Sequence, residues 1–148
     1  NRALKAALIA RALPELAAYD VVLPEQKYGE ASRIDFLLRG DDLPDLYLEV
    51  KCVTLCRTPG LGEFPDSVTA RGTKHLGELA KVAQRGARAG VLYLVQRTDI
   101  SKIALAADID PAYATAAEQA RAAGVEFLCY DTTITPDEIL VNQALPIG

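Results

Sequence analysis

The sequence predicts an α/β fold in which a mixed central sheet carries flanking helices. Short alternating or apolar segments, typical of strands, stand between longer alanine- and leucine-rich segments, typical of helices. Their order is helix, three strands, helix, strand, helix, strand, which favours a three-strand meander followed by crossover units. With 148 residues, half of them apolar, the chain is long enough to bury a core, and we expect a single domain over residues 1–148.

The first half of the chain contains the first predicted helix and the meander. Residues 1–13 are rich in Ala and Leu and predict a helix that is interrupted at Pro14. The meander is predicted from a partly exposed strand over residues 19–28, a strand over 33–39, turn chemistry at 40–44 and a strand over 45–53.

The second half alternates helices with strands. Residues 58–65 are rich in Gly and Pro and predict a loop. Asp110 followed by Pro111 predicts a helix start, with Asp as the cap and Pro at the first position. The other expected elements are a helix over about 66–87, a doubly buried strand over 91–96, a helix end at Gly124, a strand over 125–130 and an extended piece over 139–147.

Composition indicates a protein of a reducing interior. Three cysteines, an odd number at uneven spacing, argue against a disulfide framework. No apolar run approaches the roughly 20 residues of a membrane helix, and no basic-then-apolar leader is seen. We therefore expect a cytoplasmic location and no membrane partner. Methionine is absent even at position 1, which suggests the C-terminal part of a longer protein.

The net charge of −4 is not typical of a nucleic-acid-binding protein, which usually has a basic excess. The distribution is more informative than the sum. Between Asp66 and Arg88 five basic residues stand against two acidic ones. This local excess is the one electrostatic indication of a polyanionic partner.

The predicted hairpin places two carboxylates opposite each other. If the loop at residues 40–44 sets the register, paired positions sum to 84, and each apolar residue of one face finds an apolar partner. On that face the pairs are Ile34 with Val50, Phe36 with Leu48 and Leu38 with Leu46. On the other face they are Leu37 with Tyr47, Asp35 with Glu49 and Arg33 with Lys51.

A pair of carboxylates with β-carbons about 5 Å apart is destabilising unless one is protonated or a cation lies between them. Asp35 and Glu49 are therefore candidate ligands of Mg²⁺ or Mn²⁺, with the carbonyl of Val50 as a further ligand. Lys51 projects from the same face as Glu49 and could orient an attacking water or neutralise charge on a phosphate. These groups together predict metal-assisted phosphodiester hydrolysis.

A surface salt bridge is the alternative reading of the same residues. Glu-x-Lys is frequent by chance, and a register slip of two would set Asp35 against Lys51 in an ordinary ion pair worth under about 1 kcal/mol. Against this alternative, Leu37, Tyr47 and Val53 share the face with the charges, which is unusual for a solvated surface.

The helix predicted from Asp66 has one packing face and one mostly cationic face. The cationic arc holds Arg71, Lys74, His75, Glu78, Lys81, Arg85 and Arg88, and the packing arc Val68, Leu76, Leu79, Ala83 and Ala87. Lys74 and His75 lie in its first half and could approach the carboxylates. A solvated outer face explains the cationic arc equally well.

Other chemistries find less support. His75 is the only histidine, and no Gly-x-Ser-x-Gly elbow accompanies it. Cys52, Cys56 and His75 would lack a fourth zinc ligand, so structural cysteines are favoured.

Several motifs together resemble the sugar fermentation stimulation protein family, SfsA. They are Lys27-Tyr28-Gly29, Ser32-Arg33-Ile34-Asp35-Phe36, Tyr47-Leu48-Glu49-Val50-Lys51, Phe64-Pro65-Asp66-Ser67-Val68-Thr69, Arg71-Gly72 and Lys74-His75-Leu76. The resemblance runs from about Asn1 to Ile147.

This resemblance implies a bacterial DNA-binding protein linked to sugar catabolism. It implies a C-terminal PD-(D/E)xK nuclease-like domain, restriction-endonuclease-like with an αβββαβ core, that follows an OB-like domain absent from this chain. The proline before the first aspartate of the nuclease consensus is Ile34 here. Nucleases of this class often add a glutamate from the first helix, and Glu15 is the candidate here.

Two functions follow as hypotheses. In the first, a Mg²⁺-dependent nuclease-like domain acts on DNA through Asp35, Glu49 and Lys51, with phosphate contacts from Arg33, Arg71, Lys74 and His75. In the second, a DNA-binding regulator uses the same fold without the chemistry, and its binding depends on salt but not on divalent metal.

Overall fold

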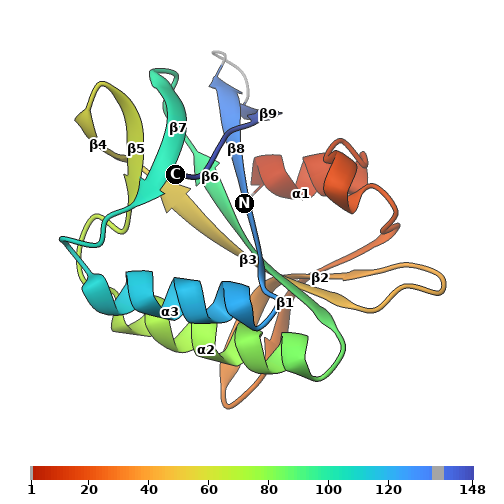
Figure 1. Ribbon diagram of the computed structural model, residues 1–148. Coiled ribbons are helices and arrows are strands. Elements are labelled where there is room, and N and C mark those ends of the chain that lie inside the picture. The colour runs from red at the N-terminus through yellow and green to blue at the C-terminus, as the bar shows by residue number, and fades with distance from the viewer. Residues whose placement is uncertain (1, 135–138) are drawn as a thin grey trace.

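A six-stranded mixed sheet forms the centre of the computed structural model, which describes residues 2–134 and 139–148 (Figure 1). Its strands, in spatial order, are β1 (Val21–Tyr28), β2 (Ser32–Arg39), β3 (Leu46–Val53), β6 (Arg88–Val95), β8 (Glu126–Ile134) and β9 (Ile139–Ala144). The central strands β3, β6 and β8 are parallel, while β1, β2 and β9 add antiparallel pairs at the two sides. The predicted fold class, a mixed α/β sheet with flanking helices, is confirmed.

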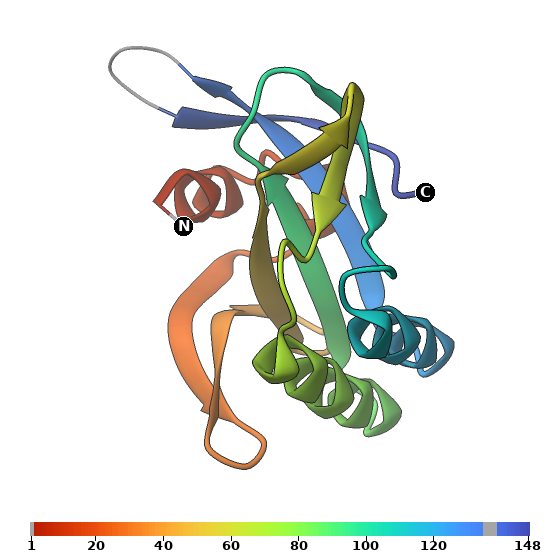
Figure 2. The ribbon, with the colours of Figure 1, turned by 90° about the vertical axis from the view of Figure 1, so that its left-hand side faces the viewer.

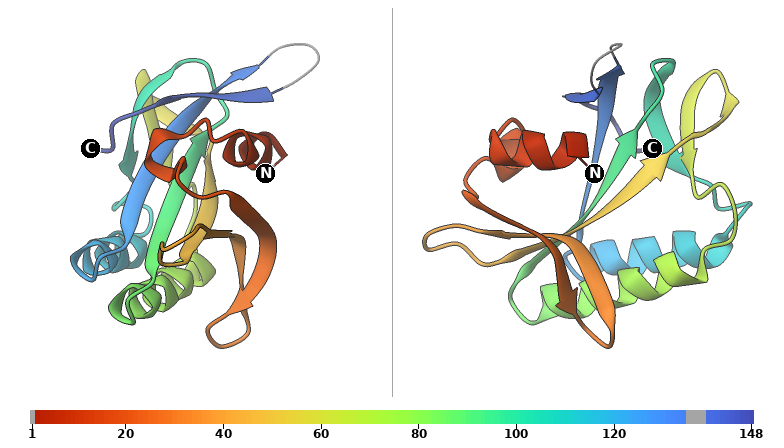
Figure 3. Two further views of the ribbon diagram at one scale, coloured as in Figure 1. Left: turned by 90° about the vertical axis from the view of Figure 1, so that its right-hand side faces the viewer. Right: turned by 180° about the vertical axis from the view of Figure 1, so that it is seen from behind.

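Each face of the sheet has its own core. Helices α2 (Ala70–Gln84) and α3 (Pro111–Ala122) cover one face together with a small second sheet of β4 (Leu55–Thr58), β5 (Gly60–Phe64) and β7 (Ile100–Leu105). Helix α1 (Arg2–Ile9) and the 3₁₀ turn η1 (Pro14–Leu16) cover the other face (Figures 2 and 3).

The three-strand meander and most of its register are confirmed. Strands β2 and β3 pair Phe36 with Leu48, Leu37 with Tyr47 and Leu38 with Leu46, as the sum of 84 predicts. The three pairs predicted beyond Phe36 are not part of this ladder. The predicted apolar contact of Ile34 with Val50 is wrong, because Ile34 joins the core under α2 and α3 whereas Val50 packs against the core under α1.

Two helix ends differ from the prediction. The first helix ends at Ile9 rather than near residue 13, because Arg11 adopts a left-handed φ of 56°; the predicted start at Asn1 lies outside the described residues. Helix α2 begins at Ala70 rather than Asp66, because Thr69 is the residue that caps it, accepting a hydrogen bond from the N–H of Gly72 at 3.0 Å. Val68 therefore precedes the helix and is 72% exposed, not packed.

The loop predicted over residues 58–65 is wrong, since β5 occupies most of it and pairs with both β4 and β7. Glycine has two roles in this segment. Gly60 turns the chain with a φ of 80°. At Gly62 an added β-carbon would come within 3.1 Å of Val53 and of Ile100, so glycine lets the small sheet pack closely on the large one.

No helix of the described chain is long and apolar enough to cross a membrane.

Candidate functional site

The ladder between β2 and β3 ends where the predicted site begins. After Phe36 and Leu48, the N–H of Val50 donates to the Asp35 carboxylate at 2.8 Å instead of continuing the backbone ladder. On β1, the other neighbour of β2, Glu25 lies between the residues that pair with Ile34 and Phe36, and it has a left-handed φ of 52°. Such distortions concentrate at functional sites, and here they coincide with the end of the β2–β3 ladder at Asp35.

Glu49 lies buried on the face of β3 that packs under α2. Its side chain is only 5% exposed, and its Oε1 is 2.7 Å from His75 Nδ1 and 3.1 Å from Lys51 Nζ. Helix α2 brings the imidazole to the carboxylate because His75 stands on its buried side. Lys51 comes from the same strand, two residues beyond Glu49, and its side chain is 19% exposed. One acidic group thus holds two potentially cationic ones in place.

Two further buried side chains, Tyr28 and Glu78, form with Glu49 what we call the inner wall of the site. Tyr28 is the last residue of β1, and its ring lies 5.9 Å from that of Tyr47. Burial raises the pKa of Tyr28 well above its ordinary value, and the nearby negative charges of Glu49, Glu78 and Asp35 raise it further. The Tyr28 hydroxyl therefore lies in the field of all three carboxylates.

No role is predicted for these two residues from the residue pattern alone. The sequence places Glu78 on the mostly cationic face of its helix, whereas the structure buries it to 8% exposure. The spacing of Glu78 from His75 is the feature that could have indicated a shared position, because residues three apart lie on one side of a helix. Tyr28 stood within a motif of the family resemblance, but nothing in the residues alone related it to the carboxylates.

The oxygen atoms of this site provide only part of the ligand shell of a hard cation. Carboxylate and carbonyl oxygens are the ligands that Mg²⁺ and Mn²⁺ prefer. In a strand the N–H and C=O of one residue point to the same side, so the Val50 carbonyl is expected beside Asp35. Within residues 2–134 and 139–148, however, no three His, Cys, Asp or Glu side chains are grouped to hold a metal ion. A cation here would need waters or a substrate oxygen to complete its shell.

The remaining predicted residues lie around or away from this cluster. Arg33, Arg71 and Lys74 are exposed, and His75 is buried against Glu49 rather than open to solvent. Glu15 lies in η1 on the opposite face of the sheet, where its carboxylate accepts a hydrogen bond from the Tyr130 hydroxyl. The structure thus does not bring Glu15 together with the other acidic residues.

The family model described as "Sugar fermentation stimulation protein RE domain" (SfsA) matches residues 1–138 of the chain. The chain belongs to the SfsA family. The sugar fermentation stimulation protein homolog of Ruegeria pomeroyi is 64% identical over 98% of this chain and 63% of its own length. The homolog of Roseobacter denitrificans is 61% identical over 99% of this chain and 63% of its own.

A solved structure of the SfsA family has the same fold. Pyrococcus furiosus SfsA, in complex with Ca²⁺, superposes with a TM-score of 0.90 at 28% identity, over 99% of this chain and 63% of that one. The chain thus spans a little under two thirds of the length of these SfsA relatives. The family resemblance expected from the motifs is confirmed.

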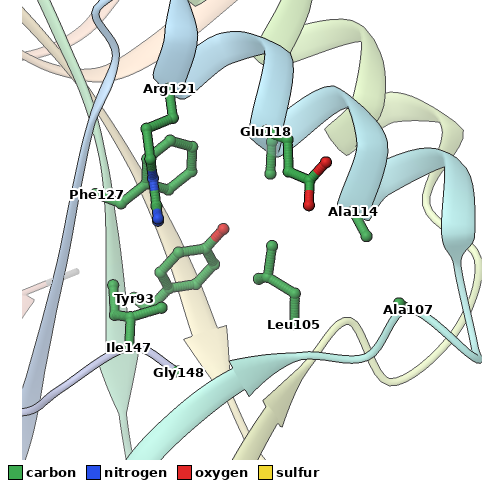
Figure 4. A pocket seen from close by; sticks show the side chains of 10 residues that line it. Tyr93, Leu105, Ala107, Ala114, Glu118, Arg121, Phe127, Ile147 and Gly148 are labelled. Atoms are coloured by element: carbon green, nitrogen blue, oxygen red, sulfur yellow. The ribbon is translucent and has the colours of Figure 1, made fainter.

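A separate pocket of about 250 Å³ lies between α3, β6, β8 and the C-terminal residues of this SfsA chain (Figure 4). Its walls are mostly apolar, and the Arg121 guanidinium lies over the Phe127 ring, 5.0 Å from the centroid. Asp35, Glu49 and Lys51 are not among the residues that form its walls. The residues of the predicted metal site therefore lie outside this pocket.

Proposed function

We propose that this domain hydrolyses phosphodiester bonds of DNA with the help of a divalent cation, Mg²⁺ or Mn²⁺. One observation carries the proposal: at the end of the β2–β3 ladder, Asp35 and the buried Glu49 stand on adjacent strands with the Lys51 ammonium against Glu49. Carboxylates so arranged would hold the cation together with the Val50 carbonyl. When bound, the ion would supply Lewis-acid stabilisation of the phosphoryl oxygens and lower the pKa of a water.

The protein's own side chains have distinct tasks in this proposal. His75 holds Glu49 in one orientation through the 2.7 Å contact of its Nδ1. The Lys51 ammonium can turn from Glu49 toward a water or a phosphate oxygen, where it orients the attack and balances negative charge. The exposed cations of Arg33, Arg71 and Lys74 would meet backbone phosphates, which position a duplex without reading its sequence.

The structure of a relative supports a divalent cation in this proposal. Pyrococcus furiosus SfsA was solved in complex with Ca²⁺, and Ca²⁺, like Mg²⁺, is a hard ion that takes oxygen ligands. The Asp35 carboxylate is the ligand to test, because its exposure is intermediate whereas Glu49 is deeply buried and structurally tied to His75.

The test is cleavage of duplex DNA by the wild-type chain and by Asp35→Asn in Mg²⁺, in Mn²⁺ and in EDTA. We expect EDTA to abolish cleavage and Asp35→Asn to slow it about 100-fold or more, the scale of losing one electrostatic stabiliser of a transition state. Glu15→Gln, an acid on the other face, should cleave like the wild type. Cleavage that survives Asp35→Asn would remove this site from the reaction.

A second function, DNA binding without hydrolysis, is favoured by a different observation. Glu49 Oε1 already has both Lys51 and His75 as partners, so much of its charge is balanced inside the protein. A regulator of sugar catabolism genes built this way would bind DNA equally well with EDTA and with Mn²⁺, and Lys51→Met would not weaken it. A gel-shift titration under both conditions separates the two functions.

A further inference from the structure

Two buried polar atoms of the inner wall have no hydrogen-bond partner among the residues that the structure describes. They are the Tyr28 hydroxyl and Glu78 Oε2, and both side chains are 8% exposed. A buried polar atom without a partner costs on the order of 1–3 kcal/mol, more when it is charged. Such atoms are retained where a ligand, an ion or a water completes them.

Helix α2 and the turn after β1 bring these atoms to the carboxylates. Glu78 follows His75 by one helical turn, and His75 contacts Glu49. The Glu78 carboxylate lies directly against Gly29, where an added β-carbon would come within 2.7 Å of Oε2. Gly29 follows Tyr28 in the chain, with a φ of 58° that suits glycine. The two atoms therefore belong to the same inner wall as Glu49.

The inner wall is acidic. Glu49 and Glu78 are buried, and the negative charges of Asp35, Glu49 and Glu78 all act on the Tyr28 hydroxyl. A divalent cation at the Asp35–Glu49 pair would lower the cost of burying the Glu78 carboxylate.

The spacing of these groups favours contact with an ion through water over direct ligation by three side chains. No set of three His, Cys, Asp or Glu in the described ranges is close enough to ligate one ion directly. Mg²⁺ keeps several waters in its shell, and side chains beyond direct reach can hold those waters. A cavity of about 330 Å³ lined by Gly29, Glu30, Glu78, Lys81 and Arg85 adjoins the Glu78 side chain.

We propose that Glu78 and Tyr28 hold the water shell of the divalent cation that Asp35 and Glu49 bind. Glu78 accepts hydrogen bonds from the waters of the ion, and the Tyr28 hydroxyl donates to or accepts from them. The inference rests on the proposed cation site and extends it from two strands to helix α2 and the end of β1.

The experiment is Mn²⁺ titration of the 148-residue chain by calorimetry, comparing wild type with Glu78→Gln, Tyr28→Phe and Asp35→Asn. Glu118→Gln, an exposed glutamate of α3, is the matched control. We expect Glu78→Gln to weaken Mn²⁺ about 10-fold at unchanged stoichiometry, since outer-shell partners typically account for 10- to 100-fold in affinity. Tyr28→Phe should weaken it in the same direction, and Glu118→Gln should not change it.

The melting temperature in EDTA separates binding from folding. Glu78→Gln removes a buried charge, so its melting temperature without metal should equal or exceed that of the wild type, while its gain on adding Mn²⁺ should shrink.

Each outcome of these measurements supports or overturns the inference. Unchanged Mn²⁺ affinity in Glu78→Gln, with binding lost in Asp35→Asn, overturns the role of Glu78 and leaves the cation site standing. A wild-type chain that binds no Mn²⁺ overturns the inference together with the proposed function.

Discussion

At the scale of single residues, one buried polar contact joins the hydroxyls of two tyrosines. Tyr93 Oη and Tyr113 Oη are 2.7 Å apart, and both side chains are at most 1% exposed. Burial raises the pKa of both phenols, so both stay neutral and each has the other as its partner. The pair connects β6 to α3.

Removing both hydroxyls of this pair should cost less than the two single removals added together. We expect Tyr93→Phe to lower the free energy of unfolding by about 1–3 kcal/mol, because the Tyr113 hydroxyl is then buried without a partner. The double variant with Tyr113→Phe should cost less than the sum of the two single ones. Urea unfolding followed by circular dichroism measures all three. Additive losses would show that the two hydroxyls do not depend on each other.

The residues of the site were predictable to different degrees. Glu49 and Lys51 could be placed together because a strand has a period of two. Asp35 could be placed on the neighbouring strand because the turn length sets the register of the pairs up to Phe36. Tyr28 and Glu78 could not be placed, because their proximity depends on how the β1–β2 turn meets α2, a contact between segments about 50 residues apart. The end of the ladder at Asp35 was also not predictable, since a side chain there replaces a backbone bond.

At the scale of elements, one carboxylate joins the two helices that cover the site. Asp110 Oδ1 accepts from the N–H of Tyr113 at 3.1 Å, as the predicted helix cap requires, and Oδ2 accepts from the N–H of Thr69 at 2.8 Å. Thr69 is in turn the cap of α2. Asp110, 3% exposed, thus ties the starts of α2 and α3 together.

Asp110→Ala should therefore destabilise more than loss of a single helix cap. We expect a decrease of about 2–4 kcal/mol in the free energy of unfolding, since two hydrogen bonds to a buried carboxylate are lost. Thr69→Ala, which removes only the side-chain cap of α2, should cost about 1 kcal/mol. Equal losses in the two variants, measured by urea unfolding, would contradict the bridging role.

Elements with strong local signals were predicted better than those set by packing. The meander, β6 and the start of α3 follow from alternation, an apolar run and an Asp-Pro cap. Strand β5 contains two glycines and is held by its neighbours and by close packing at Gly62. An ion-pair network at the same place, in which Arg57 contacts both Glu63 and Asp108, also joins segments that no local pattern relates.

At the scale of the whole molecule, the position of cations matters more than their number. The chain carries a net charge of −4, so any affinity for DNA has to come from a local field. Arg71 and Lys74 are exposed in the first half of α2, beside the proposed site. Arg2 and Lys5 are equally exposed on α1, across the sheet from that site (Figure 3). The chain thus offers two matched pairs of cations on opposite faces.

Neutralising each pair in turn tests which face meets DNA. Arg71→Ala with Lys74→Ala and Arg2→Ala with Lys5→Ala both change the net charge by two units, from −4 to −6. If α2 faces the duplex, only the first double variant should weaken binding. For that variant, the slope of log K against the logarithm of the salt concentration should become less steep by about 1.8, which is about 0.9 for each lost phosphate contact. Fluorescence anisotropy with a labelled duplex between about 50 and 200 mM salt measures this slope. The same decrease in both variants would mean that DNA responds to net charge alone. A decrease confined to the α1 pair would place the duplex on the face opposite Asp35 and Glu49, where it could not reach them.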